Sequence, residues 1–498
     1  AKCFGINLAR LDIRQESSRH NQLIHELVKR KYKKDYYKFS EKEKIEFLKS
    51  LIGKKKNIIK NFNFKNEENK EVWSTFKTLS YEPAECLGAY VISMTTSASD
   101  ILSVSFLQKE ANIKNKLRVV PLFETLDDLI NSKSIMQSLF SQKWYRKLIK
   151  NKQEVMIGYS DSGKDAGKMC ASWHQYKAQE EIVKLAKKFN IEVVFFHGRG
   201  GSAGRGGGPI QATLRSLPPN SVNGKIRITD QGEVIQQKYG YEPLAKYNIC
   251  SYIGAVTEAT LNPPPTPKNN WRDLTEKMSD IAKSSYRKNI NQSSDFIKYF
   301  KIVTPHVALG KLSIGSRPSK RKNVDNIKSL RAIPWVFAWT QVRLMLPAWL
   351  GSTEALRYAY HKRSRKILFD MEKNWPFFNA MLDMLDMVIS KVDPDISKIY
   401  EEFLADESLK RVGKKLRFQF DVIKKLNKKI TPKEIAVTRK PFRSQIIVRN
   451  IYSEVLNIIQ PVVIRKLKVN KNSKNKQYLN DALLTSIAGI SAAMKNTG

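Results

Sequence analysis

The sequence predicts an α/β fold that is predominantly helical overall, with an α/β barrel as the first expectation. Short apolar runs repeatedly precede a polar loop and a long amphipathic segment, which is the order found in parallel sheets with helical crossovers. Polar residues gather each time after the apolar run, where the catalytic face of an α/β barrel lies. A doubly wound open sheet also binds ligands at that end and is the alternative.

The expected elements follow from hydrophobic periodicity and helix caps. Strands are predicted at 8–13, 117–123, 154–159, 193–197 and 225–229. Helices are predicted at 21–34, at 41–52 behind a Ser40 cap, and at 168–189, and buried helices between 83 and 107. From about Trp335 onward the patterns are almost wholly helical. We expect the C-terminal part of a catalytic barrel over 1–350 and a helical region over 351–498.

Composition excludes several classes of protein. The chain has 498 residues and 41% hydrophobic content, which suits a globular protein with a substantial core. Its four cysteines form no Cys-x-x-Cys pair, so we expect reduced thiols in a cytoplasmic protein. The most apolar long segment, 332–350, contains Gln341 and Arg343 and is too polar for a membrane span. The net charge of +41 is spread along the chain without a nucleic-acid motif, so neither nucleic acid nor membrane is expected as a partner.

A glycine-rich loop after the fourth expected strand is the first candidate for catalysis. Residues 193–209 read VVFFHGRGGSAGRGGGP, a strand-favouring run followed by a loop with seven glycines. Glycine lets main-chain N–H groups approach a ligand, and the guanidinium groups of Arg199 and Arg205 suit phosphate or carboxylate. His197 ends the strand and can exchange a proton near neutral pH. The segment predicts an anion-handling catalytic loop, with a flexible linker as the alternative.

Two other glycine patterns resemble nucleotide-binding motifs without fitting them. Residues 158–164, GYSDSGK, nearly match a P-loop, but Asp165 replaces the magnesium-binding hydroxyl and Asp161 places a negative charge in the anion cradle. Residues 198–203 resemble a dinucleotide fingerprint, yet no Asp or Glu occurs between Gly198 and Thr229 to hold a ribose. The sequence therefore disfavours a P-loop enzyme and excludes nicotinamide binding.

Two carboxylates and three further arginines complete the candidate site. Glu124 and Asp161 each follow an expected strand, and with waters and a substrate oxygen they would suit Mg2+ or Mn2+. The alternative is that one of them caps the following helix. Arg14, Arg317 and Arg331 join the loop arginines, and several such arginines together imply a multiply anionic substrate.

Five motifs together resemble phosphoenolpyruvate carboxylase of the bacterial type. They are LDIRQES at 11–17, PLFETL at 121–126, VMIGYSDSGKD at 155–165, FHGRGGS at 196–202 and the terminal NTG at 496–498. The resemblance covers the whole chain. It implies an elaborated TIM-like α/β barrel, incomplete here at its N-terminus, in a homotetramer. The enzyme would be a magnesium-dependent lyase that joins bicarbonate to phosphoenolpyruvate and gives oxaloacetate and phosphate, an anaplerotic supply to the tricarboxylic acid cycle.

The resemblance also implies roles for the candidate residues. Glu124 and Asp161 would bind the metal, and Lys164 would be an active-site residue. The phosphate would be held by Arg14, Arg199 and Arg331, with Arg317 nearby. His197 and Arg205 would line the bicarbonate and carboxyphosphate side. An inhibitory site for aspartate or malate would be formed by Arg205, Lys391, Arg449 and Asn496.

Two features depart from the family pattern. The family's Thr-Ala-His-Pro-Thr motif, which carries an essential histidine, is absent, so we expect the C-terminal portion of a longer protein. Residues 304–308, TPHVA, stand where the family pattern has acidic residues. The alternative function is a catalytically incomplete remnant that keeps ligand binding as a regulatory or scaffold protein.

Overall fold

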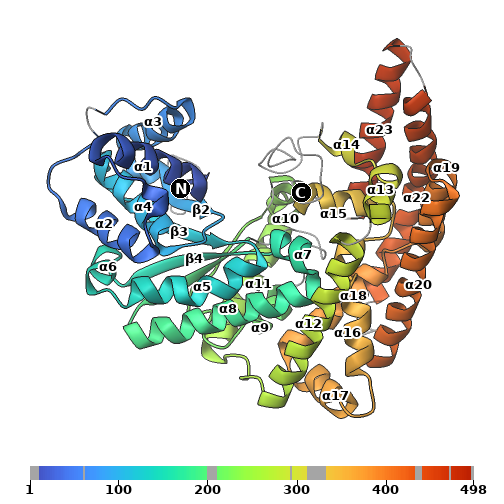
Figure 1. Ribbon diagram of the computed structural model, residues 1–498. Helices are drawn as coiled ribbons and strands as arrows, with labels where there is room; N and C mark the ends of the chain where they lie inside the picture. Colours follow the sequence, from blue (N-terminus) through green and yellow to red (C-terminus); the bar gives the residue numbers. More distant parts are fainter. Residues whose placement is uncertain are drawn as a thin grey trace. The chain divides into compact units, whose positions relative to one another are not determined.

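The computed structural model describes residues 10–59, 62–198, 210–230, 232–291, 294–310, 332–431, 440–469 and 473–494. The chain divides into two compact units, coloured along the sequence in Figure 1. Unit 1 comprises Ala1–Gly158, Lys177–Gly198 and Lys225–Arg227, and unit 2 comprises Tyr159–Tyr176, Arg199–Gly224 and Ile228–Gly498. The domain boundary predicted after residue 350 stays a prediction.

A parallel sheet organises unit 1. Its strands are β1 (Leu11–Glu16), β2 (Leu87–Ser93), β3 (Arg118–Phe123), β4 (Lys152–Gly158), β5 (Glu192–Gly198) and β6 (Arg227–Ile228). Their order in the sheet is their order along the chain, and β1 to β5 pair in parallel. A doubly wound sheet reverses its strand order at a switch point. Among the described strands no reversal occurs, so the predicted α/β class is confirmed and the open-sheet alternative is not supported.

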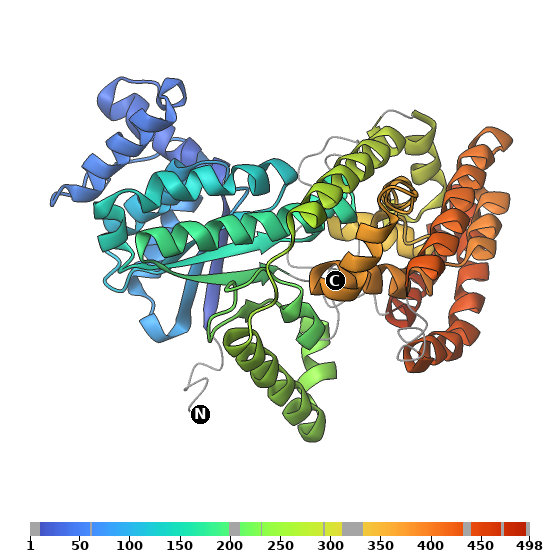
Figure 2. The same ribbon diagram turned by 90° about the horizontal axis from the view of Figure 1, so that it is seen from below.

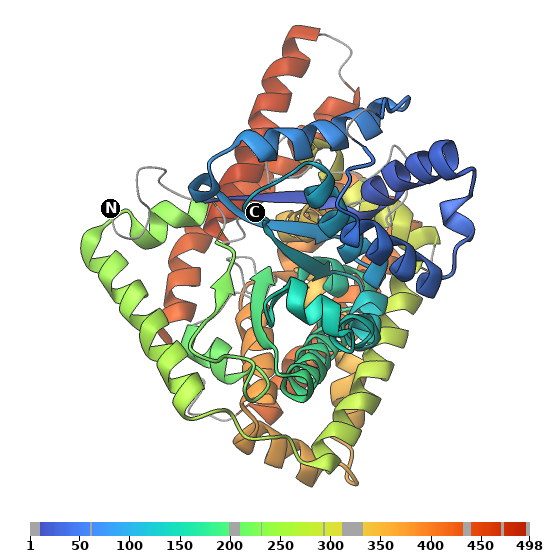
Figure 3. The same cartoon turned by 90° about the vertical axis from the view of Figure 1, so that its left-hand side faces the viewer.

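The sheet is curled, with its two edge strands turned towards each other (Figure 3). Arg227 in β6 forms ion pairs with Asp12 in β1 and, at 2.6 Å, with Glu154 in β4. In a flat sheet of six strands the edges would be about 24 Å apart at ~4.8 Å per strand, too far for such a pair. The guanidinium of Arg227 also lies 4.3 Å from the centroid of the Phe196 ring in β5. These contacts define the concave face of the sheet.

Apolar side chains from neighbouring strands cover part of this concave face. Val91 pairs with Val120, and Met156 pairs with both Leu122 and Phe196. Together with Ala89 they form one buried cluster. Since side chains alternate along a strand, the residues between them face the helices.

The helices of unit 1 connect the strands on the convex side (Figures 2 and 3). They are α1 (Ser17–Tyr32), α2 (Glu41–Gly53), α3 (Glu67–Tyr81), α4 (Ala98–Glu110), α5 (Leu126–Phe140), α6 (Lys143–Leu148) and the C-terminal part of α8 (Lys168–Phe189). The predicted Ser40 cap is confirmed. Its side chain accepts a hydrogen bond from the Glu43 N–H, and its own N–H donates to the Glu43 carboxylate at 2.7 Å.

Predicted and observed elements differ in three places. The helices predicted between 83 and 107 are wrong in the first half, because β2 is a strand there. Its short apolar run is largely buried on both faces, and periodicity does not separate such a strand from a buried helix. The first strand begins at Leu11 and runs to Glu16, so Arg14 lies inside β1. The last strand, β6, is shorter than predicted.

Unit 2 is helical, and its described residues after Ile228 contain no strand, as predicted for the C-terminal region. Helix α22 runs side by side with α23 and packs on α19 (Figures 1 and 2). No described helix is both long and apolar enough to span a bilayer. The helices that lie wholly in unit 2 are α7 (Ser160–Ala166), α9 (Ile210–Arg215), α10 (Gly232–Tyr239), α11 (Glu242–Leu261), α12 (Asn269–Asn291), α13 (Ser294–Val303), α14 (His306–Leu309), α15 (Ala332–Gln341), α16 (Ser352–Ala359), α17 (Arg365–Asn374), α18 (Pro376–Ile389), α19 (Pro394–Leu404), α20 (Glu407–Ile430), α22 (Lys440–Val469) and α23 (Ser473–Ala493).

Candidate active site

Arg14 projects from β1 across the concave face of the sheet. Its backbone pairs with Val91 in β2, yet its Nη2 atom lies 3.2 Å from the Sδ atom of Met156 in β4. The side chain therefore spans β2 and β3 and places its guanidinium above the apolar cluster. A cation over an apolar floor suits the binding of a phosphate or carboxylate.

Glu124 follows β3 and is buried, with 4% of its surface exposed. Its Oε2 atom accepts a hydrogen bond of 3.0 Å from the Met94 N–H. The cap of α5 is made by other residues, since the Asp128 carboxylate accepts from the N–H groups of Glu124 (3.1 Å) and Thr125 (2.9 Å). Burial raises the pKa of Asp128. The interpretation of Glu124 as the helix cap is therefore excluded.

Two glycines end the strands beside Glu124. Gly158 closes β4 and Gly198 closes β5, and the two residues pair with each other. A Cβ atom on Gly158 would lie 3.0 Å from Glu124 Cα and 3.3 Å from its Cγ. A Cβ atom on Gly198 would lie 2.9 Å from Met156 Cε. Glycine at these two positions therefore allows the ends of β3, β4 and β5 to approach one another closely beside Glu124.

His197 lies within β5 rather than at its end, because the strand continues to Gly198. It pairs with Ile157 and is 1% exposed. The alternation of the strand places it with Phe195, whose ring centroid is 6.4 Å away, on the face opposite Phe196. The register thus separates His197 from the face that carries Arg14, and its role in proton transfer stays a prediction.

Asp161 and Lys164 lie in helix α7 of unit 2, three residues apart and therefore on one side of the helix. Asp161 is in the first turn, where the helix dipole favours a carboxylate. Helix α12 anchors α7, since the Tyr286 hydroxyl donates to the Lys164 carbonyl at 2.8 Å. Arg287 forms an ion pair of 3.1 Å with Asp165, the residue that breaks the P-loop pattern. No sequence pattern predicts that pair, because its two residues are far apart along the chain.

The two described candidates for the inhibitory site also lie in unit 2. Lys391 follows α18 and is 7% exposed, and its ammonium donates to the Met494 carbonyl at 2.8 Å. Arg449 lies in α22 and donates to the Gln445 side chain at 3.1 Å. Sequence reasoning missed Arg343, which is buried and whose Nε atom donates to the Lys391 carbonyl at 3.1 Å.

Five predicted residues lie outside the described part of the chain, and their roles stay predictions. They are Arg199, Arg205, Arg317, Arg331 and Asn496. Among the described residues, no group of three or more His, Cys, Asp and Glu side chains could by itself hold a metal ion. Carboxylate oxygen is nevertheless a ligand that Mg2+ prefers, so Glu124 stays a candidate.

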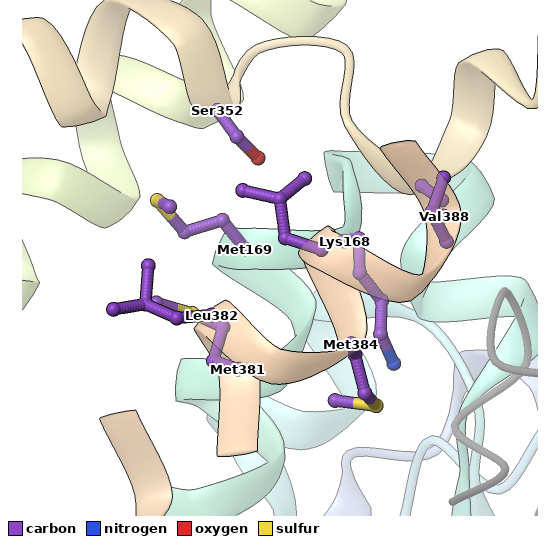
Figure 4. A pocket seen from close by; sticks show the side chains of 9 residues that line it. Lys168, Met169, Ser352, Met381, Leu382, Met384 and Val388 are labelled. Atoms are coloured by element: carbon purple, nitrogen blue, oxygen red, sulfur yellow. The ribbon is translucent and has the colours of Figure 1, made fainter. Parts of the chain in front are cut away.

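A small cavity in unit 2 does not suit this chemistry (Figure 4). It offers about 20 Å³, room for roughly one water molecule. Its walls carry no carboxylate, histidine or cysteine, so it is a packing gap. The lining residues are Lys168, Met169, Ala348, Ser352, Met381, Leu382, Met384, Leu385 and Val388.

The fold and the strand geometry define a protein of the α/β class with parallel strands in chain order. Arg14, the buried Glu124 and the glycine pair lie on or at the ends of these strands. The family model described as phosphoenolpyruvate carboxylase matches residues 1–498. The chain belongs to the phosphoenolpyruvate carboxylase family.

Three curated relatives show the extent of the likeness. A phosphoenolpyruvate carboxylase of Shewanella sediminis is 45% identical over 498 residues, which is 100% of this chain and 56% of that protein. One of Proteus mirabilis is 43% identical over the same 498 residues, again 56% of its length. Phosphoenolpyruvate carboxylase 3 of Arabidopsis thaliana is 42% identical over 99% of this chain and 54% of its own length. The chain thus spans about half the length of these relatives.

Proposed function

We propose that this chain supplies part of the active site of an enzyme that carboxylates phosphoenolpyruvate with bicarbonate, giving oxaloacetate and phosphate. Family membership supports the reaction. The structural support is the placement of Arg14, Glu124 and Gly158 on or at the ends of the parallel strands. The curled sheet with strands in chain order supports a TIM-like barrel. The free thiols of Cys86, Cys170 and Cys250 support a cytoplasmic enzyme.

The chemistry requires that negative charge be held while it moves between oxygen atoms. The Arg14 guanidinium binds a phosphate of the substrate or of carboxyphosphate and stabilises charge in the transition state. Arg199 and Arg331 would join it, with Arg317 nearby, and His197 and Arg205 would act on the bicarbonate side, with Lys164 as a further active-site residue. Glu124 and Asp161 would hold Mg2+ or Mn2+, which when bound polarises substrate oxygens.

The test replaces Glu124 by Gln and Asp161 by Asn in the full-length enzyme. Oxaloacetate formation is followed by coupled reduction to malate while the Mg2+ concentration is varied. We expect loss of metal-dependent turnover with an unchanged circular dichroism spectrum. Asp128→Asn is the matched control, because that carboxylate caps α5 and should affect stability rather than metal dependence. Unchanged metal dependence in Glu124→Gln would refute the assignment.

We further propose that aspartate or malate inhibits the enzyme at a site that includes Lys391 and Arg449, with Arg205 and Asn496. A dicarboxylate requires two cationic groups and a polar amide, which these residues provide. Binding that withdraws Arg205 from the active site would couple inhibitor to substrate. A coupling of about 1–3 kcal/mol would weaken substrate binding some 5–150-fold.

A homotetramer is the assembly that we propose, and α22 supports association between copies of the chain. One face of this helix exposes a stripe of large apolar side chains, each between 48% and 72% exposed, which are Ile447, Val448, Ile451, Tyr452, Val455, Ile458 and Ile459. Their spacing of three and four residues makes the stripe continuous. A continuous exposed apolar stripe is typical of a surface that another protein chain covers.

The alternative, a catalytically incomplete remnant, predicts ligand binding without turnover. A family match over all 498 residues does not favour it. The same assay separates the two functions, because a remnant would form no oxaloacetate in the full-length protein at any Mg2+ concentration.

A further inference from the structure

Arg343 is held rigidly in the turn after α15. Its backbone has φ of 56°, in the left-handed region, and its carbonyl accepts a hydrogen bond of 2.9 Å from the Asp393 N–H. Only 1% of the residue is exposed. An arginine is seldom buried to this degree without a carboxylate partner, because the desolvation of its charge is costly.

The guanidinium of Arg343 donates to neutral acceptors. Nε donates to the Lys391 carbonyl at 3.1 Å, Nη2 to Asn450 Oδ1 at 3.0 Å and Nη1 to Ser453 Oγ at 3.4 Å. Within the described part of the chain, no carboxylate oxygen lies within 4.0 Å of it. Burial lowers the pKa of Arg343, although the negative charges of Asp393 and Glu454 act in the other direction. A positive charge that is only partly compensated is therefore buried at this point.

These hydrogen bonds connect the two elements that carry the predicted inhibitor ligands. Lys391 stands in the connection between α18 and α19, and Arg449 precedes Asn450 in α22. The rigid fork of one guanidinium thus contacts both elements at once, by a backbone carbonyl on one side and by two side chains on the other. The distance between these two segments therefore depends on the Arg343 guanidinium.

We propose that Arg343 is a positioning residue of the dicarboxylate site, which fixes Lys391 relative to α22. This inference rests on the inhibition proposed above. The two carboxylates of the inhibitor are a fixed distance apart, so the two cations that bind them must be held at a matching distance. Arg343→Lys would keep the positive charge but lose the planar guanidinium whose hydrogen bonds connect the two elements.

The test measures oxaloacetate formation against aspartate concentration in the full-length enzyme, with each rate normalised to the uninhibited rate of the same variant. We expect Arg343→Lys to raise the half-inhibiting aspartate concentration about 10-fold, within the usual range of coupling between sites. Asn450→Ala removes the shorter of the two hydrogen bonds from Arg343 to α22 and should act in the same direction, so a poorly folding Arg343 variant does not end the test. The matched control is Arg417→Lys, because Arg417 is also largely buried in unit 2 but pairs with Glu401. It should lower the thermal midpoint and leave aspartate inhibition unchanged.

Three outcomes separate this inference from the function on which it rests. If neither aspartate nor malate inhibits the wild-type enzyme, the regulatory function fails and the inference fails with it. If Arg449→Ala relieves inhibition but Arg343→Lys and Asn450→Ala do not, the site stands and the role of Arg343 is refuted. If Arg417→Lys relieves inhibition as much as Arg343→Lys, the effect is general destabilisation and the inference is also refuted.

Discussion

Gly413 in α20 gives the sharpest prediction about the packing of unit 2. A Cβ atom on this residue would lie 1.8 Å from Glu401 Oε1 and 2.3 Å from its Cδ atom. Glu401 in α19 is 1% exposed, and its Oε1 accepts from the Tyr299 hydroxyl at 2.7 Å and pairs with Arg417. Gly413→Ala must therefore displace a buried carboxylate from its two partners.

The magnitude follows from two opposing effects. Alanine is favoured over glycine inside a helix by about 1 kcal/mol. Breaking a buried ion pair by displacing one partner costs about 3–5 kcal/mol. The net expectation is a loss of about 2–4 kcal/mol in the free energy of unfolding.

Denaturation with guanidinium chloride, followed by tryptophan fluorescence, measures this loss. The signal reports mainly on unit 2, which contains Trp173, Trp271, Trp335, Trp339, Trp349 and Trp375. Gly254→Ala is the matched control, because Gly254 lies in helix α11 and a Cβ atom there meets nothing within 4 Å. That variant should lose no stability. If Gly413→Ala is as stable as Gly254→Ala, the carboxylate moves at no cost and the argument from the clash is refuted.

Two further predictions concern pH and assembly. Burial lowers the pKa of His20 to about 3, and its Nε2 atom lies 2.8 Å from the Tyr90 hydroxyl. In the unfolded chain this histidine takes up a proton near pH 6.5, whereas in the native state it does not. The stability contributed by neutral His20 is therefore full above pH 6.5 and falls as the pH drops below it. At pH 5.5 the loss in the free energy of unfolding is about 1.4 kcal/mol. His20→Gln should flatten this pH dependence in denaturation experiments from pH 8 to 5. An unchanged slope in that variant would contradict the assignment. Ile451→Glu, in the exposed stripe of α22, should lower the oligomer mass measured by light scattering, whereas Lys424→Glu on α20 should not; an unchanged mass for Ile451→Glu would exclude this stripe as an interface.

Much of the sheet could be predicted from the sequence because its signals are local. The apolar runs of β3, β4 and β5 are each followed by a polar loop and a helix, and their positions agree with the prediction within two residues. Glu124 and Asp161 were found by the same local rule, since each follows a strand. β2 was missed because its run of small and apolar residues has no period that distinguishes a strand from a buried helix.

The geometry of the candidate site could not be predicted, because it depends on contacts between residues far apart in the sequence. The contact of Arg14 with Met156 requires the curl of the sheet, and the close approach of Gly158 to Glu124 requires the ends of β3 and β4 to lie side by side. Asp128 caps α5 in place of Glu124, and the choice between two carboxylates four residues apart depends on the local backbone geometry.

Helix α22 has an exposed apolar stripe and a buried side that is partly polar. Ser453, Asn457 and Gln460 are all at 0% exposure there, together with the buried apolar residues Ile446, Val463 and Ile464. Asn457 donates to the Gln341 carbonyl at 2.7 Å, and Gln460 donates to the Gln341 side chain at 3.0 Å. Buried amides are tolerated only where such partners exist, so these bonds fix the register of α22 against α15.

Helix α22 takes part in both the proposed association of subunits and the proposed inhibition. Asn450 and Ser453, on its buried side, accept hydrogen bonds from Arg343, while Ile451 lies between them and belongs to the exposed stripe. A shift of α22 that changed its contacts with another copy would therefore also change the hydrogen bonds that position the inhibitor site. Subunit association and aspartate affinity should then depend on each other, since coupling through a shared element is reciprocal.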